Sequence, residues 1–201
     1  MRVIVACEFS GRVRDAFIAS GHEAVSCDLL PTESNGPHYQ GDVFDIIDDG
    51  WNLMIAHPPC TYLCSSGLHW NKRKPGRAAK TEEALEFVQR LLEVPIERIA
   101  LENPVGCIST RIRKYDQAIQ PWMFGDNASK NTCLWLKNLP PLVPTNIVEP
   151  RIVDGKKRWA NQTDSGQNRL GPSEDRCKIR SATYAGIAAA MAEQWGPICH
   201  P

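Results

Sequence analysis

The chain has 201 residues with 23 basic and 23 acidic side chains, so its formal net charge is zero. This length and a hydrophobic content of 42% are typical of one folded domain with its own core, and they argue against a disordered chain. Zero net charge excludes a uniformly polycationic nucleic-acid coat. We therefore expect a single domain over 1–201, in which any nucleic-acid contact comes from local basic patches.

The 8 cysteines are scattered along the chain, which is typical of reduced thiols rather than of a disulfide scaffold. No apolar run approaches the roughly 18 residues of a membrane span. The first residues start directly as a strand and lack a signal-peptide layout. The sequence therefore predicts a cytoplasmic protein.

Short apolar runs alternate with helical stretches in the first hundred residues, which is typical of an α/β domain with a mostly parallel sheet flanked by helices. Strands are predicted at 3–7, 23–27, 52–56 and 98–101, with a turn and a further short strand at 42–47. One helix is predicted at 12–20 and stops at Gly21, and a longer one starts near Thr81 as its N-cap.

Prolines interrupt the second half, where we expect loops, short strands such as 133–136, and a last helix at 183–195. Residues 140–180 are expected to form an irregular basic insert. Its part 151–180 has eight basic and four acidic residues, a local balance of plus four. Trp159 follows three basic residues in this insert and is a candidate for contact with nucleic acid, although core or surface packing is the commoner role.

Two windows follow predicted strands, at the sheet edge where open α/β sheets build their sites. In the first, two prolines stiffen the turn before Cys60 and present its thiol as a candidate nucleophile. In the second, Glu102 precedes Asn103 and Pro104; if partly desolvated, its proton affinity rises, so that it can share a proton with a ring nitrogen. The alternatives are a buried structural cysteine and a glutamate that caps a turn.

Together the windows Phe9-Ser10-Gly11, Pro58-Pro59-Cys60 and Glu102-Asn103-Pro104 resemble the DNA cytosine-5 methyltransferase family, in particular its short phage or prophage members. The core of that family runs Phe-x-Gly, Pro-Pro-Cys and Glu-Asn in this order. The resemblance implies a Rossmann-like fold dependent on S-adenosylmethionine, with the target-recognition region reduced or absent.

The resemblance implies that Cys60 adds to carbon 6 of cytosine while Glu102 stabilises a proton at ring nitrogen 3. Asn103 and Pro59 would shape the pocket of a base flipped out of duplex DNA. The enamine formed in this way takes a methyl group at carbon 5, and Cys60 is then expelled.

The resemblance assigns S-adenosylmethionine contacts to the first loop, to the acids after the second and third strands, and to the proline turn: Phe9, Ser10, Gly11, Asp28, Asp42 and Pro58. Val13 and Arg14 replace two glycines that the family has after Gly11. Arg12 or Arg14, together with the helix start behind Gly11, is then a candidate for binding the methionine carboxylate.

Basic residues follow the cysteine turn where the family has its closing loop, which predicts a mobile cationic loop that closes on DNA: Lys72, Arg73, Lys74 and Arg77. A solvated loop before a helix is the alternative. Arg111, Arg113 and Lys130 are further candidates for cations aimed at the base and phosphate. The family's Gln-x-Arg-x-Arg signature is absent, and Lys130-Asn131-Thr132 stands in its approximate place.

Other functions stay open. Cys60 and Cys64 lie near His57 and His69, but no Cys-x-x-Cys pair is present, so no metal site is predicted. An enzyme acting on a free nucleotide or another acceptor would keep the Cys/Glu pair, and a catalytically silent relative would only bind DNA. Because the insert is short, we expect weak or very short site specificity, or a homodimer or partner chain that supplies it.

Overall fold

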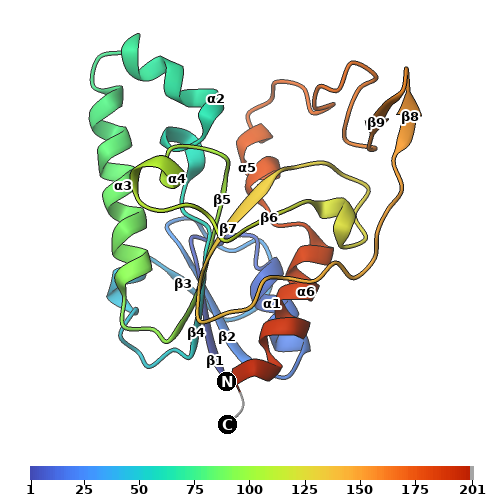
Figure 1. Ribbon diagram of the computed structural model, residues 1–201. Coiled ribbons are helices and arrows are strands. Elements are labelled where there is room, and N and C mark those ends of the chain that lie inside the picture. The colour runs from blue at the N-terminus through green and yellow to red at the C-terminus, as the bar shows by residue number, and fades with distance from the viewer. Residues whose placement is uncertain (200–201) are drawn as a thin grey trace.

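A central sheet of seven strands forms the middle layer, in the order β3-β2-β1-β4-β5-β7-β6 (Figure 1). The computed structural model describes residues 1–199 and every side chain among them except those of Cys177 and Cys199. The last two residues of the expected domain therefore lie outside the described residues. The strands are β1 (Arg2–Ala6), β2 (Glu23–Asp28), β3 (His38–Gln40), β4 (Leu53–Ala56), β5 (Arg98–Pro104), β6 (Gln117–Ile119) and β7 (Thr132–Lys137).

Strand β7 is antiparallel to both β5 and β6, whereas the four pairings among β3, β2, β1, β4 and β5 are parallel. The predicted mostly parallel α/β sheet is therefore confirmed. Strand β1 lies between β2 and β4, so the chain winds outward from it in both directions. The carboxyl ends of β1 and β4 flank the point where the strand order reverses, and such a point is where open α/β sheets bind ligands.

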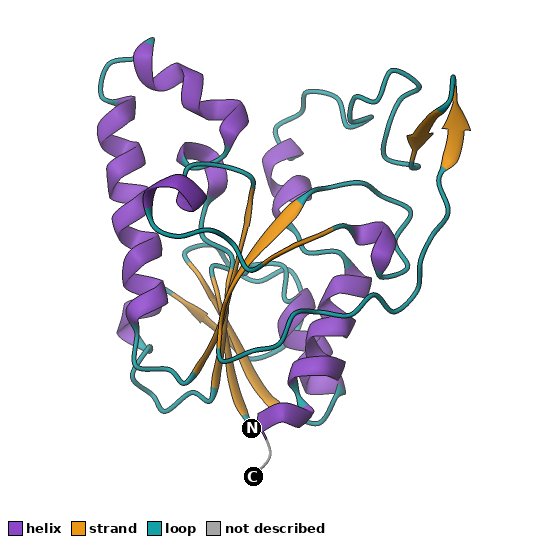
Figure 2. Ribbon diagram, viewed as in Figure 1, coloured by secondary structure: helices purple, strands orange, loops and turns teal. Residues whose placement is uncertain are grey.

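Helices cover both faces of the sheet (Figure 2). Side chains alternate along β1, so that Val3 and Val5 join one buried cluster and Ile4 and Ala6 join the other. The first cluster is completed by α1 (Arg12–Ala19) and α6 (Ala185–Trp195), and the second by α3 (Arg77–Glu93). Shorter elements are α2 (Ser65–Leu68), α4 (Ile108–Arg111), α5 (Arg176–Ser181) and the hairpin of β8 (Arg151–Val153) and β9 (Lys156–Arg158).

The predicted strand at 42–47 is wrong. The third strand is β3, and the Asp42 carboxylate accepts from the Phe44 amide at 3.0 Å to start a 3₁₀ helix over Val43–Asp45. A short acidic side chain that binds the amide two residues ahead favours such a turn over an extended chain.

The predicted start of the long helix is also wrong. Helix α3 begins at Arg77, after Gly76 with φ 75°, and Thr81 lies within it. The Thr81 hydroxyl donates to the Tyr62 carbonyl at 3.1 Å and accepts from the Asn71 amide at 2.9 Å. Because this hydroxyl fastens the helix to the cysteine turn, it does not cap the helix, and the good helix formers between Arg77 and Lys80 add a turn.

The segment between β7 and α6 contains the β8–β9 hairpin, the helix α5 and loops. Its Trp159 ring stacks on Trp122 at 5.4 Å between centroids, and its Nε1 donates to the Val148 carbonyl. Trp159 therefore packs within the protein on at least one face. Residues 1–199 contain no helix that is long and apolar enough to cross a bilayer.

Candidate active site

The cysteine turn begins where β4 ends. Pro59 has extended backbone angles, φ −55° and ψ 121°, and Cys60 then opens a 3₁₀ helix over Cys60–Tyr62. The Leu63 and Cys64 amides both donate to the Cys60 carbonyl at 3.0 Å. The half-buried Cys60 is therefore the first residue of a rigid turn at the carboxyl edge of the sheet.

Strands β4 and β5 pair, with Ala56 opposite Leu101, so the two windows lie at the same edge of the sheet. Both Glu102 and Asn103 belong to β5, which extends three residues beyond the predicted end. The Asn103 side-chain amide donates to the Pro58 carbonyl at 2.7 Å. This buried bond fixes the proline turn relative to the strand that carries Glu102.

The loops that follow β4 and β5 also bind each other. The Cys107 amide donates to the Leu63 carbonyl at 2.9 Å, and a Cβ at Gly106 would lie 2.0 Å from that carbonyl oxygen. Only glycine permits this approach of the two backbones. The positions of Cys60 and Glu102 are thus set by backbone contacts.

The largely buried Glu102 accepts from His57, with 3.3 Å between Nδ1 and Oε2. Burial raises the pKa of Glu102, but the His57 hydrogen bond, the charges of Lys130 and His57 and the Thr132 hydroxyl together outweigh it and hold the pKa below its ordinary value. We expected desolvation to raise the proton affinity of Glu102. This expectation is wrong, because the net effect of its surroundings is a lower pKa. Glu102 is ionised at neutral pH.

Burial raises the pKa of the Cys60 thiol, the charges of Cys64 and Glu102 raise it further, and Lys130 lowers it. The free protein therefore has a protonated thiol at neutral pH. Lys130 acts electrostatically on both Cys60 and Glu102, and its Nζ donates to the Arg180 carbonyl at 2.9 Å. Of the three single cations predicted near the base, Lys130 is the one whose charge bears on both groups.

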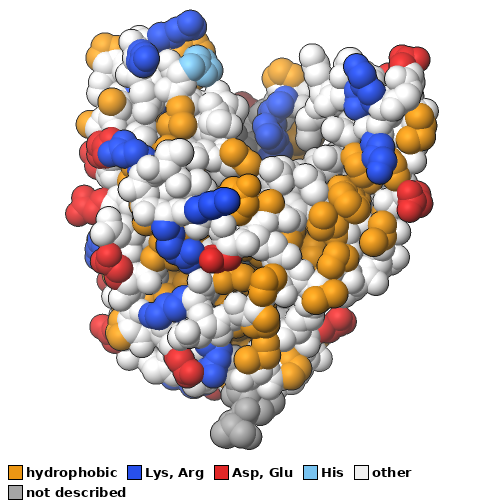
Figure 3. Space-filling view, in the orientation of Figure 1, with side chains coloured by type: hydrophobic (Ala, Val, Ile, Leu, Met, Phe, Trp, Pro, Cys, Tyr) orange, Lys and Arg blue, Asp and Glu red, His pale blue; other side chains and the backbone are white. Residues whose placement is uncertain are grey.

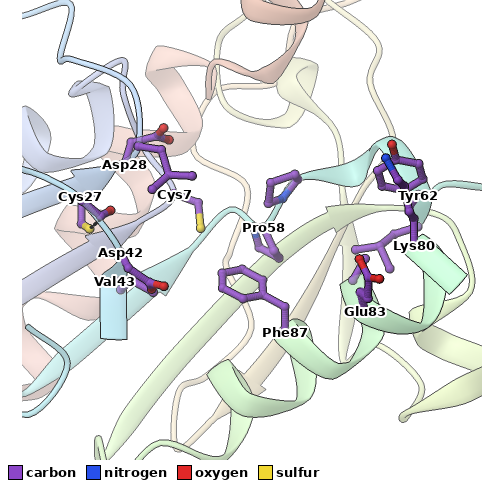
Figure 4. Close-up of a pocket in the computed structure, with 15 residues that line it drawn as sticks. Cys7, Cys27, Asp28, Asp42, Val43, Pro58, Tyr62, Lys80, Glu83 and Phe87 are labelled. Carbon is purple, nitrogen blue, oxygen red and sulfur yellow. Dashed lines mark hydrogen bonds between the residues drawn. The ribbon is translucent and has the colours of Figure 1, made fainter. Parts of the chain in front are cut away.

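A cavity of about 470 Å³ opens beside the proline turn (Figure 4). Asp28 and Asp42 lie on one side of it, and Pro58 and Phe87 on the other. Pro59 and Tyr62 also line it, so the cavity is continuous with the turn that carries Cys60. Two carboxylates on one side, suited to ribose hydroxyls, and an aromatic ring on the other side suit an adenosine group.

The first loop is arranged differently from the expectation. Phe9, Ser10 and Gly11 are not among the residues that line this cavity. The buried Glu8 carboxylate instead accepts from the Val13 amide at 2.7 Å, from the Arg14 amide at 3.2 Å and from the Ser10 hydroxyl at 3.2 Å.

The amides at the start of α1 are thus bound by a carboxylate of the chain itself, which contradicts their proposed role for the methionine carboxylate. The fully buried Arg14 guanidinium is bound to Asp15, Ser26 and Ser34. Arg12 donates to the Thr183 carbonyl at 2.9 Å. The Arg14 guanidinium is therefore occupied by protein acceptors, whereas the exposed Arg12 as a carboxylate ligand stays a prediction.

The basic segment after the cysteine turn is folded, which corrects the expectation of a cationic loop. It forms α2 and a 3₁₀ helix over His69–Lys72, followed by the start of α3. Lys74 lies 4.9 Å from the Trp70 ring centroid, and Arg77 lies 4.8 Å from that of Tyr62. These aromatic contacts give the segment its local order, while Lys72, Arg73 and Lys74 remain exposed.

The other two predicted cations are bound elsewhere. Arg111 forms a bidentate salt bridge with Glu82 of α3, with N–O distances of 3.0 and 2.8 Å. Arg113 binds Asp116 at 2.7 Å and the Leu136 carbonyl at 2.9 Å. Both guanidinium groups already have protein acceptors.

Figure 3 shows the molecule hollowed at its upper edge, between the part over α2 and the part over the β8–β9 hairpin. Lys and Arg side chains lie inside this hollow and on both sides of it. Within residues 1–199, no group of three or more His, Cys, Asp or Glu side chains is arranged to hold a metal ion.

Among the residues of this site that sequence reasoning missed are His57 and Thr132 beside Glu102, and Phe87 in the cavity. Phe87 lies three residues after Ala84 on α3, and both line the cavity. In the sequence, the spacing of Phe87 from the other apolar residues of this helix is also that of a helix face packed in the core. His57 stands next to the recognised Pro-Pro-Cys window, so its position was a usable signal.

Neither a family model nor a curated protein matches this chain. Among solved structures, an E. coli prophage protein described as a DNA modification methyltransferase has a TM-score of 0.50 and 16% identity, covering 77% of this chain and 56% of that one. The S. pombe Dnmt2 methyltransferase has a TM-score of 0.47 and 15% identity, covering 70% of this chain and 51% of that one. Spodoptera frugiperda DNMT2 has a TM-score of 0.43 and 15% identity, with 78% and 57% covered.

This chain thus spans about half the length of these proteins. The likeness to the prophage protein concerns the fold alone, and it confirms the predicted Rossmann-like α/β fold.

Proposed function

We propose that this chain is an S-adenosylmethionine-dependent methyltransferase that acts on carbon 5 of cytosine in DNA, with Cys60 as nucleophile. The observation that supports this proposal most is that the Cys60 turn is fixed next to the strand that carries Glu102, beside a cavity suited to adenosine. A rigid thiol and a carboxylate at one sheet edge match the requirements of attack on a pyrimidine ring. The 2.7 Å bond from Asn103 to Pro58 maintains this pairing.

In the proposed reaction, Glu102 takes up a proton from solvent as the substrate binds and shares it with ring nitrogen 3, while the Cys60 sulfur forms a bond to carbon 6. The electron pair displaced from the 5,6 double bond makes carbon 5 nucleophilic. S-adenosylmethionine, when bound, would supply the methyl group that carbon 5 takes, with S-adenosylhomocysteine as the leaving group. A base then removes the carbon 5 proton, and the carbon–sulfur bond breaks to release Cys60.

The free thiol must lose its proton before it attacks. Because burial and the Glu102 charge raise the pKa of Cys60, the thiolate fraction at neutral pH is small. Lys130 favours the thiolate, and a cation or base that arrives with the substrate would favour it further. We therefore expect the rate of adduct formation to increase as the pH is raised above neutrality.

Asp28, Asp42, Pro58 and Phe87 are the proposed contacts of the adenosine group. Asp28→Ala is expected to weaken binding of S-adenosylhomocysteine about 10- to 100-fold, because a hydrogen bond to a charged group contributes ~1.5–3 kcal/mol. Titration calorimetry of the purified variant measures this change.

Asp48→Ala is the matched control, since Asp48 is exposed and does not line the cavity. Equal affinities of the two variants and the unmodified protein would place the cofactor elsewhere.

The exposed Lys72, Arg73 and Lys74 are proposed to bind DNA phosphates near the hollow, with the target cytosine flipped out of the duplex. Replacing all three by alanine is expected to weaken DNA binding and to reduce the slope of log affinity against log salt by up to about three. Fluorescence anisotropy over a salt series measures both quantities.

The charge-preserving triple variant Lys72→Arg, Arg73→Lys, Lys74→Arg should behave like the unmodified protein. An unchanged rate of methylation in the alanine variant would instead favour a free nucleotide as acceptor. The insert at 140–180 uses Arg151, Arg158 and Arg169 for internal contacts, which supports a limited role in reading sequence. Specificity supplied by a second copy or a partner chain remains a prediction.

The experiment that tests the proposed function is a methyl-transfer assay with deuterated S-adenosylmethionine, followed by digestion and mass spectrometry of the nucleosides. Duplex DNA, single-stranded DNA and deoxycytidine monophosphate are compared at equal cytosine concentration. Labelled 5-methylcytosine from duplex DNA is the expected result. Label that appears only in the free nucleotide, or duplex binding without any methyl transfer, would each refute the proposal.

A further inference from the structure

His57, the residue before the proline turn, has its ring against Glu102. Its Nδ1 lies 3.3 Å from Glu102 Oε2, and the two side chains are 8% and 13% exposed. The His57 backbone amide donates to the Ala6 carbonyl at 2.9 Å, so the ring is anchored at the carboxyl ends of β1 and β4. The contact with Glu102 joins this anchor to β5.

The direction of the hydrogen bond follows from the partners. An ionised carboxylate can only accept, so Nδ1 carries the proton and donates. The other ring nitrogen, Nε2, is buried and has no hydrogen-bond partner among the described residues.

Other groups also surround the carboxylate. Lys130 and Thr132 approach it from the β7 side, and Cys60 and Cys133 interact with it electrostatically. Lys130 attracts the ionised form, whereas both thiols stay neutral beside it. His57 follows β4 and contacts the carboxylate through Oε2.

We infer that His57 is a positioning residue: it donates to Glu102 Oε2, keeps this buried carboxylate ionised in the free protein and holds it in one orientation. Its effect on methylation rests on the proposed function. Its effect on the ionisation of Glu102 does not.

The direct test is the pH titration of the Glu102 carboxyl carbon by NMR in glutamate-labelled protein, with the resonance identified by its loss in Glu102→Gln. In His57→Ala the midpoint is expected to move to higher pH, because burial is then opposed by fewer groups. In His57→Asn it is expected to stay near the original midpoint, because the Asn side-chain amide can donate from nearly the place of Nδ1.

Turnover should follow the same order. His57→Ala is expected to lower kcat about tenfold or more with little change in KM, and His57→Asn to restore most of it, because the loss concerns orientation. An unchanged midpoint in His57→Ala would overturn the inference, as would equal losses of kcat in both variants.

A measurement on the unmodified protein serves if His57→Ala does not fold. The nitrogen chemical shifts of the His57 ring distinguish a protonated from an unprotonated Nδ1 at neutral pH, and an unprotonated Nδ1 would overturn the inference. If the midpoint moves as expected and duplex DNA is never methylated, the positioning role stands and the proposed function fails. The two proposals are thus tested separately.

Discussion

Cys60→Ser is expected to abolish the covalent adduct and to lower methyl transfer at least about 10³-fold, because a serine hydroxyl is far less ionised than a thiol at neutral pH. The test uses an oligonucleotide with 5-fluorocytosine, in which fluorine replaces the carbon 5 proton and the final elimination cannot occur. Incubation with S-adenosylmethionine and intact-mass analysis should show protein, oligonucleotide and one methyl group joined together. Cys60→Ser should show only the separate components.

Cys64→Ser is the matched control for this result. Cys64 belongs to the same turn and is also half-buried, and its Sγ lies 3.1 Å from the Ser66 hydroxyl. Cys64 is not the proposed nucleophile, so its replacement should leave the adduct intact. An adduct that persists in Cys60→Ser, or that disappears in a folded Cys64→Ser, would contradict the proposed nucleophile.

The order of the elements could be predicted from the sequence wherever a single apolar run forms a single strand. Residues 3–7 and 52–56 correspond closely to β1 and β4, because buried parallel strands need continuous apolar side chains. Strand β6 has three residues and is defined by its pairing with β7. No local sequence pattern therefore predicts it. The start of α3 was misplaced because Thr81 has a tertiary partner 19 residues away in the chain.

The site was predictable to the extent that its residues follow strands. Cys60 and Glu102 were found in this way, since neighbouring parallel strands bring their carboxyl ends together. The ionisation of Glu102 was not, because it depends on His57, 45 residues earlier in the chain, and on Lys130 beyond β6. The role of Glu8 at the start of α1 was also hidden, since a buried carboxylate that binds amides resembles any loop acid in sequence.

Glu102→Gln is expected to change two rates in opposite directions. Methyl transfer should fall about 10²- to 10⁴-fold, the range typical of losing a positioned proton-transfer group. The ionised carboxylate raises the pKa of Cys60, so its neutral replacement lowers that pKa and increases the thiolate fraction at neutral pH. Alkylation of Cys60 by iodoacetamide should therefore become faster than in the unmodified protein.

Peptide mass spectrometry measures the alkylation at Cys60 separately from the other cysteines, at several pH values and without substrate. Asp116→Asn serves as the control, because Asp116 pairs with Arg113 and is not among the groups that act on Cys60. Local unfolding in Glu102→Gln would also expose the buried Cys133, whereas a purely electrostatic effect accelerates Cys60 while Cys133 stays protected. Slower alkylation of Cys60 in Glu102→Gln, or unchanged methyl transfer, would show that the carboxylate and the thiol do not act as a pair.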